Sequence, residues 1–311
     1  MRKFLLVCAL FLAASAALAP LPAAAALQVD VTQGNAQPLP IAIPDMISAD
    51  PAQAAMGANI ASVVRADLTR SGLFRSIDPK AFVEHITNIN VAPTFQSWRA
   101  INAQGLVAGQ VTLQPDGRLR VDFRLWDVYG ESQMLGQQFF TQPENWRRVA
   151  HLVSDAIYER VTGEKGYFDT RIVFVSESGP ATKRVKRLAV MDEDGANPIF
   201  LTRGDYMVLT PRFNPTAQMI AYMSYIATKP HIYLFDLETG RQEELGNFPN
   251  MTFSPRFSPD GNRVALVLEN GGNSDVYVMD LRSRAVIRLT TDPAIDSAPS
   301  FSPDGRQITF E

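Results

Sequence analysis

The sequence predicts a two-domain protein, in which a small α+β domain (a mixed sheet with helices) precedes a β-propeller. Two observations predict this fold class. In the second half, a short proline-containing phrase recurs three times at a spacing of 44 residues, and β-type runs follow each copy. Before about residue 163 strand patterns alternate with helical patterns, whereas only strand patterns follow it. A fixed period indicates repeated supersecondary units, and the change of pattern indicates two folding units.

The three copies of the phrase read PRFNP at 211–215, PRFSPDG at 255–261 and PSFSPDG at 299–305. After each copy come runs of four to six residues rich in Val, Ile, Tyr and Phe, bounded by Gly, Pro, Asn and Asp. This is the pattern of short strands joined by turns. Four such strands in about 40–45 residues make one blade of a propeller.

The Pro-Asp-Gly turn of the phrase is expected to join the first two strands of each blade. Asp tolerates the backbone geometry of such a turn, and Gly supplies a positive φ. The recurring aspartate also invites a metal-binding or catalytic interpretation. Turn chemistry explains better why the same residue returns in successive units.

The first 26 residues have the pattern of a secretory signal peptide. Arg2 and Lys3 form a basic start, residues 4–12 form an apolar core, and small residues lead to a cleavage site after Ala26. A single-pass anchor is the alternative, but the apolar core is too short to span a bilayer. The one cysteine, Cys8, lies inside this core, so the mature chain would hold no thiol and no disulfide.

Charge and motifs exclude several classes of function. Without Arg2 and Lys3, 27 basic residues face 32 acidic ones, a net charge of −5. This balance suggests neither nucleic acid nor an anionic membrane surface as a partner. The histidines lie far apart, at 85, 151 and 231, without a second ligand at metal-binding spacing. No common hydrolase, phosphate-loop or dinucleotide motif occurs. We therefore expect no catalytic residue, metal or cofactor, and we expect His151 to be a surface or packing residue.

The first domain is expected over residues 27–165, and its elements follow from periodicity. Residues 27–46 form an extended lead-in that begins with an alternating run at 27–31. The expected elements after it are a helix at 57–73, a short helix or turn at 80–86, a short helix near Trp98, strands at 106–113, 119–128 and 135–141, and a long helix from Pro143 to Gly163.

The second domain is expected over residues 166–311 as an incomplete ring. Residues 167–311 number 145, which is enough for about three and a third units of 44 residues. Propellers have about four to eight blades. The first unit, at Arg171, starts with its second strand, and the sequence stops within a further unit at Glu311. We therefore expect a fragment of a six-bladed protein that lacks roughly 120–130 residues.

These patterns resemble the TolB family of the Tol-Pal system over the whole mature chain. The end of a helix in that family is similar to VVRADLTRSGLF at 63–74. The hairpin of the family is similar to VAGQV at 107–111 followed by PDG at 115–117. The domain boundary of the family is similar to DAIYERVTGEKG at 155–166, and its propeller units are similar to the 44-residue units of this chain. The resemblance implies a monomeric, non-enzymatic periplasmic scaffold. Its propeller mouth would bind the peptidoglycan-associated lipoprotein Pal, and its N-terminal region would contact the inner-membrane protein TolA, in support of outer-membrane integrity and cell division.

The loops before each phrase join an outer strand to the next inner strand, so we expect them at the mouth of the channel. Two of the three are unusually apolar, which is typical of a protein interface. The alternative is that their apolar residues pack against neighbouring blades. Met251 stands where the family often has a histidine, which would leave an apolar contact there. The expected partner-binding residues are Tyr206, Met207, Val208, Leu209, Thr210, Met251, Thr252, Phe253, Ile295, Asp296 and Ser297.

Other functions remain open at this point. Similar propellers accompany serine peptidase domains or form sugar-lyase sites, and the catalytic part would then be missing from this sequence. A lyase would need clustered ligands at the axis, for which the rim loops offer Asp296. A soluble propeller that binds a small ligand in its channel is a third interpretation.

Overall fold

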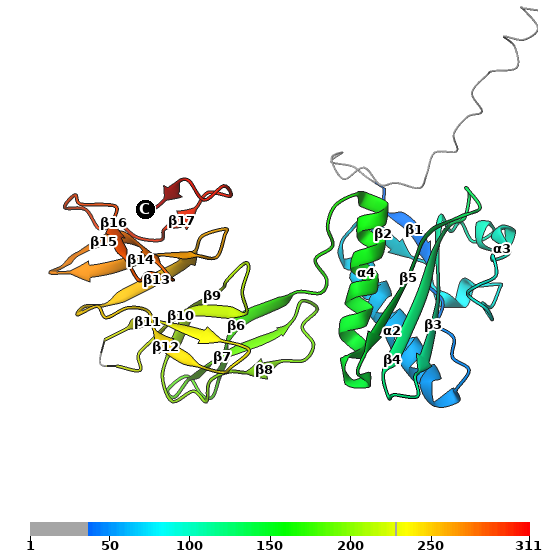
Figure 1. Ribbon diagram of the computed structural model, residues 1–311, viewed down its shortest axis with the longest axis horizontal. Helices are drawn as coiled ribbons and strands as arrows, with labels where there is room; N and C mark the ends of the chain where they lie inside the picture. Colours follow the sequence, from blue (N-terminus) through cyan, green and yellow to red (C-terminus); the bar gives the residue numbers. More distant parts are fainter. Residues whose placement is uncertain (1–36, 228) are drawn as a thin grey trace, which may run out of the picture. The chain divides into compact units, whose positions relative to one another are not determined.

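The computed structural model describes residues 37–227 and 229–311, which divide into two compact units, one ending at Asp169 and the other starting at Thr170 (Figure 1). The expected signal peptide, its cleavage site at Ala26 and the alternating run at 27–31 lie outside the described residues. Within the described part, no helix is both long enough and apolar enough to cross a membrane.

A mixed five-stranded sheet in the order β2-β1-β3-β4-β5 forms the centre of the first unit. β1 pairs in parallel with β2 and β3, whereas β3, β4 and β5 pair antiparallel. The strands are β1 Leu39–Ala42, β2 Phe74–Ser76, β3 Gly105–Leu113, β4 Leu119–Asp127 and β5 Ser132–Thr141. β5 begins before the predicted residue 135, because the polar residues Ser132 and Gln133 continue the pairing with β4 beyond a bulge. The expected α+β class is confirmed.

Two long helices, α2 (Pro51–Arg70) and α4 (Trp146–Thr162), pack against this sheet (Figure 1). Asp50 caps α2 by accepting a hydrogen bond from the Ala52 N–H at 2.9 Å, and a proline in the first turn favours a helix start there. The predicted start at residue 57 was therefore too late, because the cap and not the apolar periodicity sets it. α4 ends as predicted at Gly163, whose φ is 78°.

Short helical segments lie in and beside the part of the chain that forms a second apolar cluster. They are η2 Pro79–Ala81 and α3 Phe95–Arg99, while η3 Pro143–Asn145 leads into α4. Trp98 of α3 is buried in this cluster with Leu106 and Val128. The helix or turn predicted over 80–86 is thus limited to one 3-10 turn.

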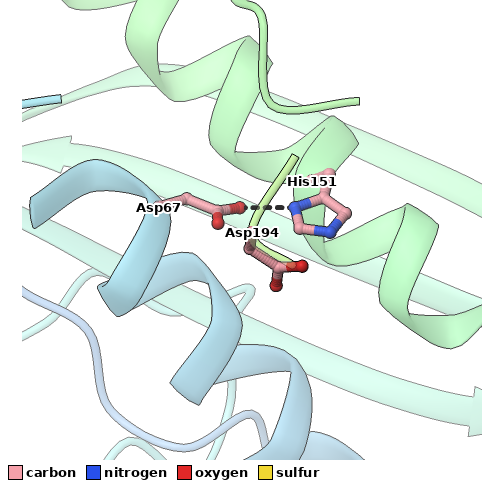
Figure 2. A group of neighbouring side chains, drawn as sticks. All are labelled: Asp67, His151 and Asp194. Carbon is pink, nitrogen blue, oxygen red and sulfur yellow. Dashed lines mark hydrogen bonds and ion pairs between the residues drawn. The ribbon is translucent and has the colours of Figure 1, made fainter. Parts of the chain in front are cut away.

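A buried polar group joins α2 and α4. One oxygen of the Asp67 carboxylate shares a hydrogen bond with His151 Nδ1 at 2.8 Å (Figure 2) and accepts one from Ser154 Oγ at 2.9 Å. The other oxygen pairs with Arg70 at 2.6 Å. Asp67 and His151 are both buried, so His151 is a packing residue, one of the two roles expected for it. Because a buried carboxylate is unfavourable without partners, this group specifies how the two helices face each other.

The second unit consists of antiparallel sheets that follow the 44-residue repeat, which confirms the expected partial β-propeller. Blade 1 has three strands, β6 Arg171–Ser178, β7 Val185–Asp192 and β8 Ile199–Phe200. Blade 2 comprises β9 Val208–Phe213, β10 Met219–Ser224, β11 His231–Asp236 and β12 Gln242–Glu244. Blade 3 comprises β13 Thr252–Phe257, β14 Arg263–Asn270, β15 Asn273–Asp280 and β16 Val286–Arg288, and β17 Ser300–Phe301 pairs with β18 Ile308–Thr309 in blade 4.

The recurring turn is closed by its own side chains. Ser258 Oγ donates to the carboxylate of Asp260, which accepts a second hydrogen bond from the Asn262 N–H at 3.1 Å. These contacts, the serine hydroxyl first, lower the pKa of Asp260. Ser302 and Asp304 repeat the arrangement in blade 4. This geometry supports turn chemistry as the reason for the recurring aspartate.

Neighbouring blades are joined by hydrogen bonds as well as by apolar packing. Asn214 Nδ2 of blade 2 donates to the carbonyl of Gly261 in blade 3 at 2.8 Å. Arg263 of blade 3 donates to the carbonyl of Gly305 in blade 4 at 3.1 Å. Each repeated turn is thus tied to the turn of the neighbouring blade. The apolar interfaces beneath hold, among others, Leu188, Ile220 and Phe235 between blades 1 and 2, and Ala221, Leu234, Val264 and Leu266 between blades 2 and 3.

Candidate protein-binding site

The two ends of the partial propeller carry different connections. In blades 2 and 3 the four strands alternate in direction in chain order. The loops that enter the inner strand and those between the second and third strands therefore lie at one end, which we call the loop end. The repeated phrase turns and the turns between the third and fourth strands lie at the other, the turn end. All predicted partner-binding segments begin at the loop end.

Three equivalent residues at the loop end are apolar, namely Met207, Met251 and Ile295, each separated from the next by 44 residues. The carbonyl of Met207 accepts a hydrogen bond from the Tyr225 N–H at 3.2 Å, and that of Met251 from the Glu269 N–H at 3.0 Å. Met207 is 48% exposed and Ile295 67% exposed, while Met251 is half-buried. These three residues could have been identified from the sequence, because aligning the three 44-residue units places them at the same position.

The loops are shorter than predicted, because β9 and β13 begin before the proline of the repeated phrase. Val208, Leu209 and Thr210 lie in β9, and Thr252 and Phe253 lie in β13. A bulge interrupts each of these strands. Each bulge includes a residue with positive φ, 48° at Thr210 and 54° at Ser254, and Ala298 at the equivalent position has a φ of 51°. Proline cannot donate to the ladder, and Pro211 and Pro255 lie within these bulges, where the regular pairing is interrupted. The assignment of these five residues to loops was therefore wrong.

Burial divides the predicted residues further. Val208, Thr252 and Asp296 are buried. Val208 packs between blades 1 and 2, and Thr252 Oγ1 accepts a hydrogen bond from the Ile232 N–H at 3.0 Å. The backbone N–H of Asp296 donates to the carbonyl of Ser274 at 2.8 Å. Leu209, Phe253 and Ser297 are half-buried, and Thr210 is exposed. The residues left with large exposed apolar surface are Tyr206, Met207 and Ile295.

Tyr225 belongs to the same exposed surface, although the sequence did not suggest it. It follows β10 in the loop between the second and third strands, its side chain is 41% exposed, and its N–H bonds to Met207. Tyr206, itself 50% exposed, is adjacent to Met207 in the chain. Only the loops entering each inner strand were considered from the sequence, so this second set of loops was missed.

Two arginines from the repeated phrases lie close together on adjacent inner strands. Burial, and then the charge of Arg212, lower the pKa of Arg256. Each guanidinium donates to the carbonyl of the proline before it, at 2.9 Å for Arg212 and 3.0 Å for Arg256. Neither forms an ion pair with a described residue. The inner strands therefore carry uncompensated positive charge.

A cavity of about 530 Å³ lies between blade 3 and the strands of blade 4. The apolar residues Ile287, Leu289 and Phe310, all exposed, line it. In the preceding pair of blades, the corresponding space is filled by packed side chains such as Leu234 and Val264. The cavity is thus part of the packing between successive blades and is separate from the loop-end surface.

Fold and site together define a two-domain protein in which an α+β domain precedes a β-propeller with an apolar loop end. Residues 27–134 match the model of the TolB amino-terminal domain, and residues 158–311 match that of the TolB beta propeller domain. The chain is similar to the crystal structure of TolB from Acinetobacter baumannii, at 32% identity and a TM-score of 0.76 over 91% of this chain and 68% of that one. The chain belongs to the TolB family.

Weaker likenesses exist to other propellers. A candidate TolB from Agrobacterium tumefaciens matches at 14% identity and a TM-score of 0.38 over 64% of this chain and 68% of that one. An oligogalacturonate lyase in complex with manganese matches at 14% identity and a TM-score of 0.37 over 61% of this chain and 66% of that one. At such scores neither match bears on the function of this chain.

Proposed function

We propose that this chain is a non-enzymatic periplasmic scaffold of the Tol-Pal system. Its propeller binds the peptidoglycan-associated lipoprotein Pal at the loop end, and its N-terminal region contacts TolA, in support of outer-membrane integrity and cell division. The observation that carries this proposal is the presence of both TolB domains in one chain, together with 32% identity to a TolB over 91% of its length. The signal-peptide pattern of residues 1–26 supports export to the periplasm.

The character of the loop end supports a role in protein recognition. Exposed tyrosine and methionine side chains are common anchors of protein interfaces. Tyr206, Met207 and Tyr225 come together through adjacent positions and a backbone hydrogen bond. The blades beneath them are packed sheets, so the loops are presented on a rigid support. Pal is expected to cover these side chains on binding.

Calorimetric titration with purified Pal tests the proposal. Met251→Asp, and Ile295→Asp at the more exposed equivalent position, place a carboxylate in the expected apolar contact. Because a buried charge without a partner is strongly unfavourable, we expect the affinity to fall by at least about 10-fold, equivalent to about 1.4 kcal/mol. Circular dichroism spectra should remain those of the unsubstituted chain.

The matched control is Ala217→Asp, which adds the same charge at an exposed position of the turn end. It is expected to bind Pal with unchanged affinity. Failure of the unsubstituted chain to bind Pal would overturn the proposed function. Full affinity in both loop-end variants would instead exclude this end as the binding surface.

A further inference from the structure

A cavity of about 210 Å³ lies between blades 1 and 2, beside the loop that enters β9. Tyr206 and Val208, two of the residues expected to bind a partner, form part of its wall. Pockets for drug-sized ligands measure about 300–1,000 Å³, so this cavity has the size for a single side chain. Its place at the loop end makes it accessible to a protein that docks there.

Tyr222 lines this cavity and carries a buried hydrogen-bond donor. It lies on β10 directly opposite Tyr233 of β11, with the two rings 6.0 Å apart. Its side chain is fully buried, and its hydroxyl makes no hydrogen bond with any residue that the structure describes. Burial raises the pKa of this phenol, so the hydroxyl keeps its proton. A buried donor without an acceptor is unfavourable, and an acceptor oxygen that reached the hydroxyl from the cavity would remove that penalty.

Arg203 and Asp205 provide one charge of each sign at the border of the cavity. Both are exposed, and neither pairs with the other or with another described residue. Gln242, whose amide is both donor and acceptor, also lines the cavity. Since the two charges balance, the lining favours neither an anion nor a cation. It favours a neutral group that both accepts and donates hydrogen bonds.

We propose that this cavity receives an asparagine or glutamine side chain of the protein that docks at the loop end. The carbonyl oxygen of the carboxamide accepts hydrogen bonds from the Tyr222 hydroxyl and from Arg203, and its NH2 group donates to Asp205. This inference rests on the proposed function, since it describes one anchor of the same interface. It identifies the polar contact that complements the apolar surface of Tyr206 and Met207.

Tyr222→Phe is the sharpest test, because it removes one oxygen atom and keeps the ring. Calorimetry with the full chain and Pal should show an affinity about 3- to 10-fold weaker, as expected for one lost hydrogen bond. Arg203→Ala should weaken binding to a similar extent. Tyr277→Phe in blade 3 and Arg282→Ala at the turn end lie outside the cavity and should leave the affinity unchanged. Unchanged affinity in both cavity variants, with Pal bound by the unsubstituted chain, would overturn the inference and leave the proposed function intact.

A probe that does not depend on Pal separates the two proposals. In an NMR titration of the chain with labelled tyrosine rings, N-acetylasparagine methylamide should shift the Tyr222 signals saturably. The shift should be lost in Arg203→Ala and should be weaker with N-acetylaspartate methylamide. This result would support the cavity even if the unsubstituted chain failed to bind Pal. Absence of any Tyr222 shift, or a stronger response to the aspartate probe, would overturn the assignment to a carboxamide.

Discussion

Replacing Gly261 with alanine tests how successive blades are joined. Gly261 has a φ of 73°, and a Cβ atom there would lie 2.2 Å from Thr216 Oγ1 and 2.4 Å from Asn214 Oδ1 of the preceding blade. Asn214 has little freedom to move away, because its Oδ1 accepts hydrogen bonds from the N–H groups of Thr216 and Ala217, both at 2.9 Å. Its Nδ2 donates to the carbonyl of Gly261 at 2.8 Å. The added methyl group would therefore disturb the link between blades 2 and 3.

The matched control is Gly240→Ala, since Gly240 has a φ of 69° and a Cβ atom there would meet no described atom within 4 Å. The left-handed conformation costs an alanine about 1–2 kcal/mol, and the less flexible unfolded chain offsets about 0.4–1 kcal/mol of this. The control should thus lose about 1 kcal/mol of unfolding free energy. Gly261→Ala should lose about 1–3 kcal/mol more, because it also displaces the buried amide of Asn214 and its hydrogen bonds.

Urea unfolding measures both variants. Far-UV circular dichroism follows the whole chain, whereas tryptophan fluorescence follows the first unit alone, because Trp98, Trp126 and Trp146 all lie there. The fluorescence transition should stay in place while the propeller transition moves. Equal losses of stability in Gly261→Ala and Gly240→Ala would refute the role assigned to the hydrogen bonds between blades.

Two further predictions concern the buried polar group and the turns. Asp67→Ala removes the buried acceptor shared by His151 and Ser154 and the carboxylate that pairs with Arg70, so tryptophan fluorescence in urea should report a loss of about 2–4 kcal/mol. Asp45→Ala, which removes the exposed partner of Arg65, should lose less than about 1 kcal/mol. Similar losses in the two variants would contradict the structural role of Asp67. The pKa of Asp260 lies below its ordinary value of 3.8. The ionised carboxylate therefore contributes to stability above pH 3.8, and this contribution is lost as the pH falls through the lowered pKa of the folded protein. Ser258→Ala removes the hydrogen bond that lowers the pKa of Asp260 most, so an NMR titration should show a higher pKa for Asp260 and an unchanged pKa for Asp304. If the pKa of Asp260 did not rise, the Ser258 hydroxyl would not be the cause of its low value.

The sequence predicted those parts of the fold that depend on local chemistry. The phrase turns recur because Ser258 and Asp260 close the turn within a few residues of each other. Gly163 marks the end of α4 for a similar reason, since only its own backbone conformation is needed there. The strand patterns around these turns then placed the blades. The start of α2 was missed because it depends on the cap of Asp50 and not on the apolar pattern.

The candidate site was harder to predict, because burial at the loop end depends on distant partners. Buried Thr252 accepts a hydrogen bond from the Ile232 N–H in the neighbouring blade, and the N–H of buried Asp296 donates to the carbonyl of Ser274. Neither partner can be inferred from the residues next to them. The same holds for His151, whose acceptor Asp67 lies on the other long helix. Tyr222 stands in an ordinary apolar run, so no pattern indicated that it would line a cavity.

The central claim is that the loop end of the propeller binds another protein. Hydrogen exchange of the full chain, compared with and without saturating Pal, tests it most directly. We predict slower exchange in the loop-end segments 203–207, 249–253 and 293–297, with no change in the turn-end segments 214–218, 258–262 and 302–306. Protection confined to the turn-end segments, or none in the propeller while Pal is bound, would contradict the claim.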